Sequence, residues 1–148
     1  MNPSVPPARD KLLFTPGPLT TSLTVKSAML HDAGSWHFEF NTLVRQIRQK
    51  LLQLAGVDPA KFECVLMQGS GTFGVESVLA TTIPPNGKLL VLSNGAYGER
   101  MIQMAQYLRI PVIPLRFPED RVLDPALLSE ELAKDPSITH VAAVHCET

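Results

Sequence analysis

The feature that most constrains the fold is an alternation, from Lys61 onward, of short apolar runs with longer stretches of helical periodicity. The apolar runs are bounded by Gly, Pro or Asn and have the length of buried parallel strands, over residues 62–67, 89–92, 112–115 and 140–144. The stretches between them predict helices, at about 73–80, 97–108 and 125–133. Repeated strand-helix-strand units imply right-handed crossovers. The sequence therefore predicts an α/β fold in which helices cover the faces of a parallel sheet.

The first sixty or so residues are organised differently. We expect a flexible Pro-rich arm over residues 1–11, followed by an extended turn in the run Thr15-Pro16-Gly17-Pro18. Ser22 and the threonines before it are suited to cap a short helix that ends near Leu30. A longer helix with one buried face and Gly56 as its stop is predicted from apolar residues at helical spacing, namely Phe40, Leu43, Val44, Ile47, Leu51 and Leu54.

Composition limits the class of protein. The chain has 148 residues, 45% hydrophobic and 18% charged, which is enough for one domain with a core or for part of a larger domain. A formal net charge of −1 gives no basic field for binding nucleic acid. No apolar run reaches the roughly 18 residues of a membrane span, and a cytoplasmic protein is expected. Cys64 and Cys146 lack metal-site spacing, and we expect both to be buried, reduced thiols.

The last predicted strand is followed directly by His145-Cys146-Glu147-Thr148. Ligands of open α/β sheets bind beyond the carboxyl ends of the strands, so this segment is expected at the edge of a site. Because no covering helix follows the strand, we expect a domain that is incomplete at its C-terminus. A compact domain that ends in a strand is the alternative.

A glycine-rich turn lies between the first predicted strand and the helix after it. Gly69, Gly71 and Gly74 satisfy the GxGxxG pattern of dinucleotide-binding proteins. The next strand, however, ends in Ser93-Asn94-Gly95, without the acidic residue that would bind the ribose. The P-loop pattern also fails, because no Lys-Ser or Lys-Thr pair follows the glycines.

Both failed motifs share one physical element, which is a set of backbone N–H groups at a helix N-terminus that attracts phosphate. Here Ser70 and Thr72 add hydroxyl groups beside the glycines, which suits a single terminal phosphate and indicates a phosphorylated cofactor. Tyr97 also follows a strand and opens a helix, where it could stack on a flat cofactor ring. The alternatives are a tight turn capped by Ser and Thr, and a tyrosine half-buried at a helix start.

Four segments together resemble the class V aminotransferases, which are pyridoxal phosphate enzymes of fold type I: Thr15-Pro16-Gly17-Pro18, Gly69-Ser70-Gly71-Thr72, Asn94-Gly95-Ala96-Tyr97-Gly98-Glu99-Arg100 and His145-Cys146-Glu147-Thr148. The resemblance covers almost the whole chain from Lys11 but less than half of such an enzyme, and it implies that residues 12–148 are the N-terminal part of the enzyme's large domain. Within the class, it is greatest to members that move the amino group of 2-aminoethylphosphonate to pyruvate. Members that act on serine or alanine with glyoxylate are the alternative.

The resemblance implies roles for individual residues. By this resemblance, the phosphate of pyridoxal 5′-phosphate is bound by Ser70, Gly71 and Thr72. Tyr97 stacks on the cofactor ring, and Thr148 lies at the edge of that ring. Pro16 and Gly17 are the implied substrate-side residues. In the family, the aspartate at the pyridine nitrogen, the Schiff-base lysine and the substrate-binding arginine all lie beyond residue 148.

No catalytic residue is therefore expected in this chain, and the isolated chain is expected to be inactive. The resemblance further implies that the intact parent is a homodimer whose substrates are a small-molecule amino donor and a 2-oxo acid, with neither nucleic acid nor a membrane as partner. A non-catalytic binding module with the same fold is the alternative from a different functional class.

Overall fold

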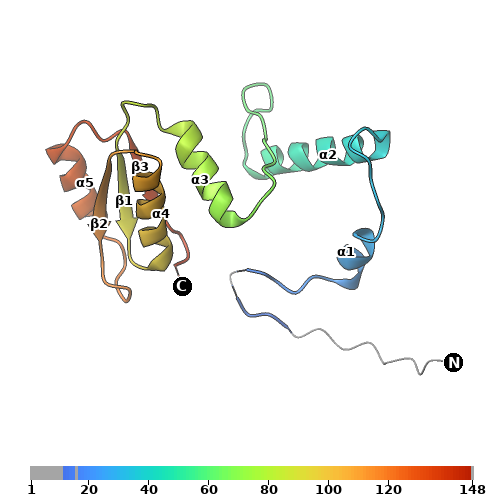
Figure 1. The fold of residues 1–148 in the computed structure, drawn as a ribbon, viewed down its shortest axis with the longest axis horizontal. Coiled ribbons are helices and arrows are strands. Elements are labelled where there is room, and N and C mark those ends of the chain that lie inside the picture. The colour runs from blue at the N-terminus through green and yellow to red at the C-terminus, as the bar shows by residue number, and fades with distance from the viewer. Residues whose placement is uncertain (1–11, 16, 148) are drawn as a thin grey trace. The chain divides into compact units, whose positions relative to one another are not determined.

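The computed structural model describes residues 12–15 and 17–147, so the expected arm over residues 1–11 lies outside the described residues. The chain divides into two compact units, Met1–Met67 and Gln68–Thr148. Figure 1 shows two helices in the first unit and a small sheet with its helices in the second. None of the described helices is long and apolar enough to cross a membrane. The assignment of residues 12–148 to one large domain stays a prediction.

The N-terminal unit contains α1 (Leu23–Ala28) and α2 (Phe38–Leu54). Ser22 caps α1, and its Oγ accepts a hydrogen bond from the backbone N–H of Val25 at 3.3 Å, which confirms the predicted cap. Helix α2 is followed by Gly56 with a φ of 66°, the left-handed conformation typical of a glycine that ends a helix. Both helix predictions are therefore confirmed in place, and α1 ends at Ala28, two residues before the predicted end near Leu30.

The predicted burial of one face of α2 is wrong for this chain. None of the residues of α2, all of which the structure describes, is buried, and Phe40 and Leu43 are 37% and 53% exposed. An amphipathic helix buries its apolar stripe only where another element covers it. Among the described residues of this unit, the other elements are one short helix and irregular segments, and they leave the stripe exposed.

The prediction of a strand over residues 62–67 is also wrong. This segment is described but has no strand conformation, and none of the three strands of the sheet pairs with it. Its contacts instead come from a side chain of α2, because Arg48 Nε donates to the carbonyl oxygen of Cys64 at 2.7 Å and the Arg48 guanidinium pairs with Glu63. A strand needs a neighbouring strand for its N–H and C=O groups, and an apolar run alone does not supply one.

The C-terminal unit has a three-stranded parallel sheet in the order β2-β1-β3, with β1 (Leu89–Ser93), β2 (Val112–Arg116) and β3 (His140–Ala143). Leu89 of β1 lies opposite Val112 of β2 and His140 of β3. Its helices are α3 (Gly71–Thr82), α4 (Ala96–Tyr107) and α5 (Pro125–Lys134). These elements confirm the predicted α/β class, three of the four predicted strands and all three predicted helices.

Two local details of the C-terminal unit agree with the sequence analysis. Asp124 caps α5 by accepting from the N–H of Ala126 at 2.8 Å, with Pro125 in the first turn. The middle strand β1 is buried along its whole length, and its Leu89 and Val91 pack with residues of α3 and α4. Helix α4 packs on β1 and contacts α3 (Figure 1). The buried apolar residues among those described therefore lie in this unit.

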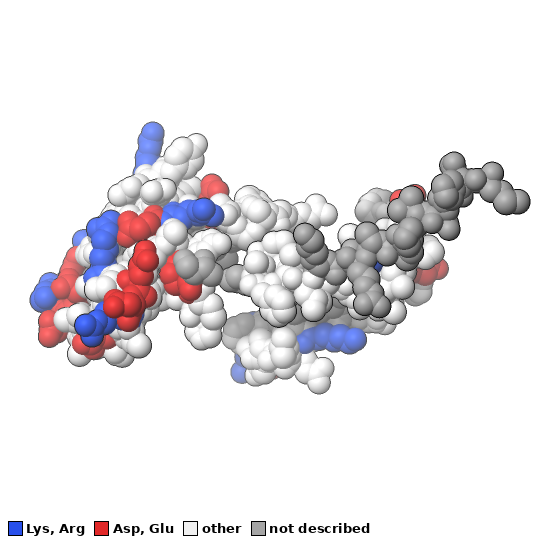
Figure 2. All heavy atoms as spheres, turned by 90° about the horizontal axis from the view of Figure 1, so that it is seen from below, with Lys and Arg blue, Asp and Glu red and all other residues white. Residues whose placement is uncertain are grey.

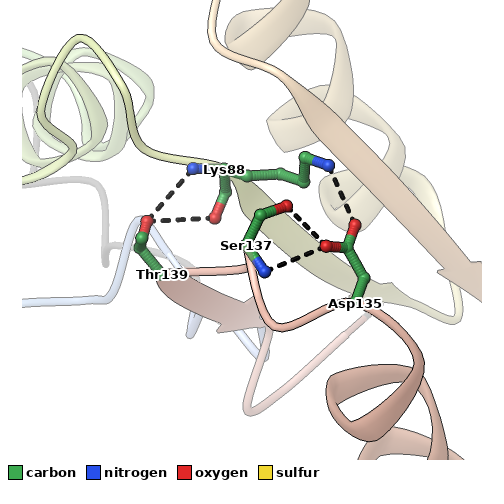
Figure 3. A network of polar contacts seen from close by, with 4 residues as sticks. All are labelled: Lys88, Asp135, Ser137 and Thr139. Atoms are coloured by element: carbon green, nitrogen blue, oxygen red, sulfur yellow. Dashed lines mark hydrogen bonds and ion pairs between the residues drawn. The ribbon is translucent and has the colours of Figure 1, made fainter.

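The amino ends of β1 and β3 are joined by a polar network, shown in Figure 3. Lys88 Nζ lies 2.8 Å from Asp135 Oδ2, and the backbone N–H of Ser137 donates to Asp135 Oδ1 at 3.0 Å. Thr139 Oγ1 accepts from the backbone N–H of Lys88 at 3.1 Å. The hydrogen bond from Lys88, followed by those from Ser137, lowers the pKa of Asp135 from 3.8 to about 2. These hydrogen bonds and the ion pair thus stabilise the amino edge of the sheet.

The two cysteines lie in different units and differ in burial. Cys64 is only partly buried, so its predicted burial is met in part, and Cys146 is exposed, so the predicted burial of Cys146 is wrong. The reason is its position beyond the end of β3, where no strand ladder or helix covers it.

Candidate cofactor site

The opposite edge of the sheet, where the strands end, is open. Strands β1 and β3 end at Ser93 and Ala143, and α4 begins on this side because it directly follows β1. The start of α3 lies on the same side, because Thr72 in its first turn contacts Arg100 near the start of α4. A hollow of about 640 Å³ lies here and is lined in part by Asn94, His145 and Glu147. The segment after β3 therefore borders a hollow at the carboxyl edge, as expected for an open parallel sheet.

The first turn of α3 has the features of a phosphate-binding helix start. Gly69 has a φ of 146°, and a Cβ at this position would lie 2.6 Å from the Phe73 ring, so the turn requires glycine. Ser70 is the N-cap, and its Oγ accepts from the N–H of Phe73 at 3.1 Å, which leaves its hydroxyl proton able to donate. The N–H groups of Gly71 and Thr72 lie at the positive end of the helix and have no partner within it. This geometry suits an anion.

Arg100 connects this turn with the predicted aromatic residue. Its Nη1 donates to Thr72 Oγ1 at 3.3 Å, and its guanidinium carbon lies 5.3 Å from the centre of the Tyr97 ring. The Thr72 hydroxyl thus accepts from a cation and keeps its own proton for donation. Tyr97 is 45% exposed, so part of its ring remains available for another contact. The structure brings the predicted residues of α3 and Tyr97 together within one compact unit.

Glu147 occupies the start of α4. Its two carboxylate oxygens accept from the backbone N–H groups of Tyr97 and Gly98 at 3.1 and 3.0 Å. Both α3 and α4 present positive helix ends at this edge of the sheet, but a carboxylate of the chain itself neutralises the end of α4. An external anion is therefore favoured at the start of α3.

An ion pair between Arg116 and Glu99 lies near the carboxyl ends of the strands. Arg116 binds Glu99 through Nε and Nη2 at 2.8 and 3.0 Å, and the buried Ser93 hydroxyl donates to Glu99 Oε1 at 2.9 Å. These bonds, that from Arg116 first, lower the pKa of Glu99, and the same pairing raises the pKa of Arg116. Figure 2 shows Lys and Arg side chains lying among Asp and Glu side chains on this unit. Arg116 is thus committed to Glu99 rather than to a ligand.

The remaining predicted site residues are not among the described residues of the C-terminal unit. Pro16 and Thr148 lie outside the described residues. Gly17 lies in the N-terminal unit, in a turn closed by the Thr15 hydroxyl, which donates to the carbonyl oxygen of Pro18 at 2.8 Å. Two residues of the site, Arg100 and Glu147, were not assigned roles from the sequence. Both lie in motifs that resemble the family, but their partners are 28 and about 50 residues away, and no local pattern reveals these contacts.

The lysines of the C-terminal unit are far from the start of α3 along the strands. By sequence this unit contains Lys88 and Lys134. Lys88 pairs with Asp135 just before β1, and Lys134 pairs with Glu131 at the end of α5, so both lie toward the amino edge of the sheet. Neither lysine is placed to react with a ligand at the carboxyl edge.

Comparison with known proteins identifies close relatives. No family model matches the chain. Over 137 residues the chain is 51% identical to 2-aminoethylphosphonate–pyruvate transaminases of Bacillus cereus and Bacillus anthracis, an alignment that covers 93% of this chain and 38% of each relative. The chain therefore spans little more than a third of the length of the curated relatives it matches.

The fold of the chain is similar to that of solved aminotransferase structures. Ureidoglycine–glyoxylate aminotransferase from Bacillus subtilis superposes with a TM-score of 0.79 and 26% identity over 90% of this chain and 34% of that one. Alanine–glyoxylate aminotransferase from Nostoc sp. superposes with a TM-score of 0.80 and 24% identity over 97% of this chain and 38% of that one. The resemblance to aminotransferases indicated by the sequence motifs is thus confirmed by both sequence and fold, and the chain is similar to a segment of 2-aminoethylphosphonate–pyruvate transaminases.

Proposed function

We propose that this chain is the phosphate-binding part of a pyridoxal 5′-phosphate-dependent aminotransferase that transfers the amino group of 2-aminoethylphosphonate to pyruvate, giving phosphonoacetaldehyde and alanine. The observation that carries the proposal is the start of α3, where Ser70, Gly71 and Thr72 present backbone N–H and hydroxyl groups beside Tyr97. The choice of reaction is supported by the 51% identity to transaminases named for it.

The described residues fit the chemistry of this cofactor. A phosphate dianion matches the positive end of α3, and Arg100 places a further positive charge beside Thr72. Tyr97 offers a half-exposed ring that would orient a flat pyridine by stacking. When bound, pyridoxal 5′-phosphate supplies the electron sink for amino-group transfer. We assign Thr148 to the edge of the cofactor ring, and Pro16 and Gly17 to the substrate side, on the family resemblance.

The proton-transfer chemistry is assigned to residues outside this chain. Lys88 and Lys134 are held in ion pairs toward the other edge of the sheet, which supports the absence of a catalytic lysine from the C-terminal unit. The 148-residue chain is accordingly proposed to bind the cofactor without turnover. The active protein would be a homodimer acting on a small amino donor and a 2-oxo acid.

Sequence identity favours the phosphonate amine over other donors. The two superposed aminotransferases named for glyoxylate are 26% and 24% identical to this chain, about half the identity of the phosphonate transaminases. Similarity to the former supports the fold, and similarity to the latter supports the substrate.

A chimera tests the reaction. Residues 1–148 would replace the matching segment of the Bacillus cereus relative, and the product would be assayed with 2-aminoethylphosphonate, serine or alanine as donor and with pyruvate or glyoxylate as acceptor. We expect phosphonoacetaldehyde and alanine to form with the first donor and pyruvate, at a rate near that of the unmodified relative. The matched control is the same chimera carrying Thr72→Ala. A chimera that prefers serine and glyoxylate would contradict the proposed substrate.

A second measurement tests the non-catalytic part of the proposal. The 148-residue chain is dialysed against pyridoxal 5′-phosphate and, separately, against pyridoxal, which lacks the phosphate. We expect binding of the former and much weaker binding of the latter, because the site is built on a helix N-terminus. Equal binding of both would show that the start of α3 does not recognise phosphate.

A further inference from the structure

Helix α4 begins without a capping side chain of its own. Its N-cap residue is Gly95, which has no side chain to accept from the first N–H groups of the helix. These groups need an acceptor, and an uncapped helix start is unfavourable. In α1, α3 and α5 the N-cap residue itself supplies the acceptor, from Ser22, Ser70 and Asp124. Helix α4 obtains its acceptor from elsewhere in the chain.

Glu147 supplies that acceptor from about 50 residues away. Its Oε1 and Oε2 accept from the N–H groups of Tyr97 and Gly98, the second and third residues of α4, which are the groups that an N-cap side chain would bind. Its negative charge also lies at the positive end of the helix, where it is stabilising. The contact joins the segment after β3 to the start of α4.

The start of α4 is shaped to admit this side chain. A Cβ on Gly95 would lie 2.3 Å from Glu147 Cγ and 2.6 Å from its Cδ. Any larger residue at this position would therefore compete with Glu147 for the same space. The glycine and the glutamate form one arrangement, in which the missing side chain of Gly95 is replaced by that of Glu147.

The consequence concerns Tyr97, because one of the two N–H groups that Glu147 binds belongs to this residue. We propose that Glu147 is a positioning residue that fixes the backbone of Tyr97 and thereby the place from which its ring reaches the cofactor. This inference rests on the proposed function for the role of the Tyr97 ring. It assigns to Glu147 no contact with cofactor or substrate. Glu147 acts through Tyr97, and Arg100 contacts the same ring from within α4.

Amide hydrogen exchange tests the first step without any cofactor. In the ¹⁵N-labelled chain, Glu147→Ala should raise the exchange rates of the Tyr97 and Gly98 amides about tenfold or more, the effect of losing a hydrogen bond to a charged acceptor. Glu147→Gln keeps an oxygen acceptor and should restore part of the protection. Gly95→Ala should reproduce the effect of Glu147→Ala with Glu147 still present, because the added methyl group displaces it. Glu130→Gln, on the exposed surface of α5, is the charge-matched control and should leave both amides unchanged.

A double-mutant cycle tests the second step. The dissociation constant of pyridoxal 5′-phosphate is measured by equilibrium dialysis for the chain, Glu147→Ala, Tyr97→Ala and the double variant. We expect Glu147→Ala to weaken binding about two- to tenfold when Tyr97 is present, the range of a stacking contact, and to have no effect when Tyr97 is absent. A cap that only stabilises the fold would weaken binding equally in both backgrounds.

The outcomes separate this inference from the proposed function. Unchanged exchange at Tyr97 and Gly98 in Glu147→Ala overturns the inference, and so does an equal loss of affinity in both backgrounds. Absence of any pyridoxal 5′-phosphate binding by the unmodified chain overturns the proposed function instead. In that case the exchange measurement alone decides whether Glu147 fixes the backbone of Tyr97.

Discussion

Arg100 Nη1 donates a hydrogen bond to Thr72 Oγ1 at 3.3 Å, and this contact connects the first turn of α3 with a side chain near the start of α4. The two helix starts carry the residues proposed to bind the two ends of one cofactor, its phosphate and its ring. The proposed phosphate-binding and ring-binding residues are therefore linked by a direct contact within the chain. This arrangement allows the contributions of Thr72 and Tyr97 to be measured separately.

Thr72→Ala removes a hydroxyl that would bind a charged phosphate. Such a hydrogen bond is worth about 1.5–3 kcal/mol, so the dissociation constant of pyridoxal 5′-phosphate should rise roughly ten- to a hundredfold. Equilibrium dialysis of the 148-residue chain at fixed pH and salt measures the change. Thr82→Ala is the matched control, since the Thr82 hydroxyl donates to the Val78 carbonyl oxygen at the other end of α3. An unchanged constant in Thr72→Ala would reduce the glycine-rich turn to a structural element.

Tyr97→Ala should have a smaller effect on affinity. Stacking contributes about 0.5–1.5 kcal/mol beyond area burial, which corresponds to a roughly two- to tenfold weaker binding. In the chimera, turnover should fall by more than affinity, because the ring's orientation is no longer fixed. Tyr107→Ala is the control from the same helix, where the side chain is 84% exposed. Equal effects of the two substitutions on affinity and turnover would count against a specific role for Tyr97.

Reductive labelling tests the assignment of the catalytic lysine to a region outside this chain. The chain is incubated with pyridoxal 5′-phosphate, treated with borohydride and digested for mass spectrometry. We expect no single lysine among the six to be labelled stoichiometrically, because Lys88 and Lys134 are ion-paired away from the start of α3. One specifically modified lysine would place the reactive amine within these 148 residues.

The network at the amino edge predicts a pH dependence of stability. The pKa of Asp135 falls from 3.8 to about 2 on folding, so its charged form stabilises the folded chain. This contribution is fully present above the ordinary pKa of the carboxyl and is lost as the pH falls from about 4 toward 2. Asp135→Asn should therefore lower the urea midpoint at pH 7, and the difference from the unmodified chain should shrink across that interval.

A control variant tests whether the pH dependence is specific to the Asp135 carboxylate. Glu130→Gln removes an exposed carboxylate that lies 3.9 Å from Lys134, and its midpoint should follow that of the unmodified chain at every pH. A difference between Asp135→Asn and the unmodified chain that stays constant down to pH 2 would mean that the ion pair with Lys88 does not lower this pKa.

The exposed apolar stripe of α2 predicts self-association. Its Leu43 and Ile47 are among several large apolar side chains that the described part of the N-terminal unit leaves in contact with solvent. Exposed apolar surface of this kind favours oligomers or aggregates. Sedimentation at micromolar concentration should show species larger than a monomer, and Leu43→Lys combined with Ile47→Lys should shift the distribution toward monomer. Arg45→Ala, on the same helix outside the stripe, is the control, and a monodisperse monomer for the unmodified chain would contradict the prediction.

Elements with local signals could be predicted from the sequence. Helices α3, α4 and α5 and strands β1, β2 and β3 follow from periodicity and from bounding Gly, Pro and Asn, and the caps at Ser22 and Asp124 follow from short-range rules. Burial could not be predicted in the same way. The apolar run at 62–67 and the stripe of α2 have the composition of buried elements, but burial depends on a partner that neither segment encodes.

For the candidate site, too, the residues in local motifs could be predicted from the sequence and the long-range contacts could not. Ser70, Gly71 and Thr72 are recognisable because glycines and hydroxyl residues between a strand and a helix form a local motif. The contacts made by Arg100 and Glu147 join segments that are distant in sequence, and they become visible only once the sheet has brought those segments together. Thr148 and Pro16 lie outside the described residues, so their roles stay predictions.

The cap that Glu147 provides also sets an order of events during synthesis. Ribosomes add about 5–20 residues per second, so the 50 residues between Tyr97 and Glu147 correspond to a delay of about 3–10 s. Once Tyr107 has been added, the nascent chain contains every residue of α4 but not yet the Glu147 carboxylate that accepts from its first N–H groups. Because β2, α5 and β3 are synthesised before Glu147, the helix start that bears Tyr97 obtains its cap only after all three strands of the sheet have been made.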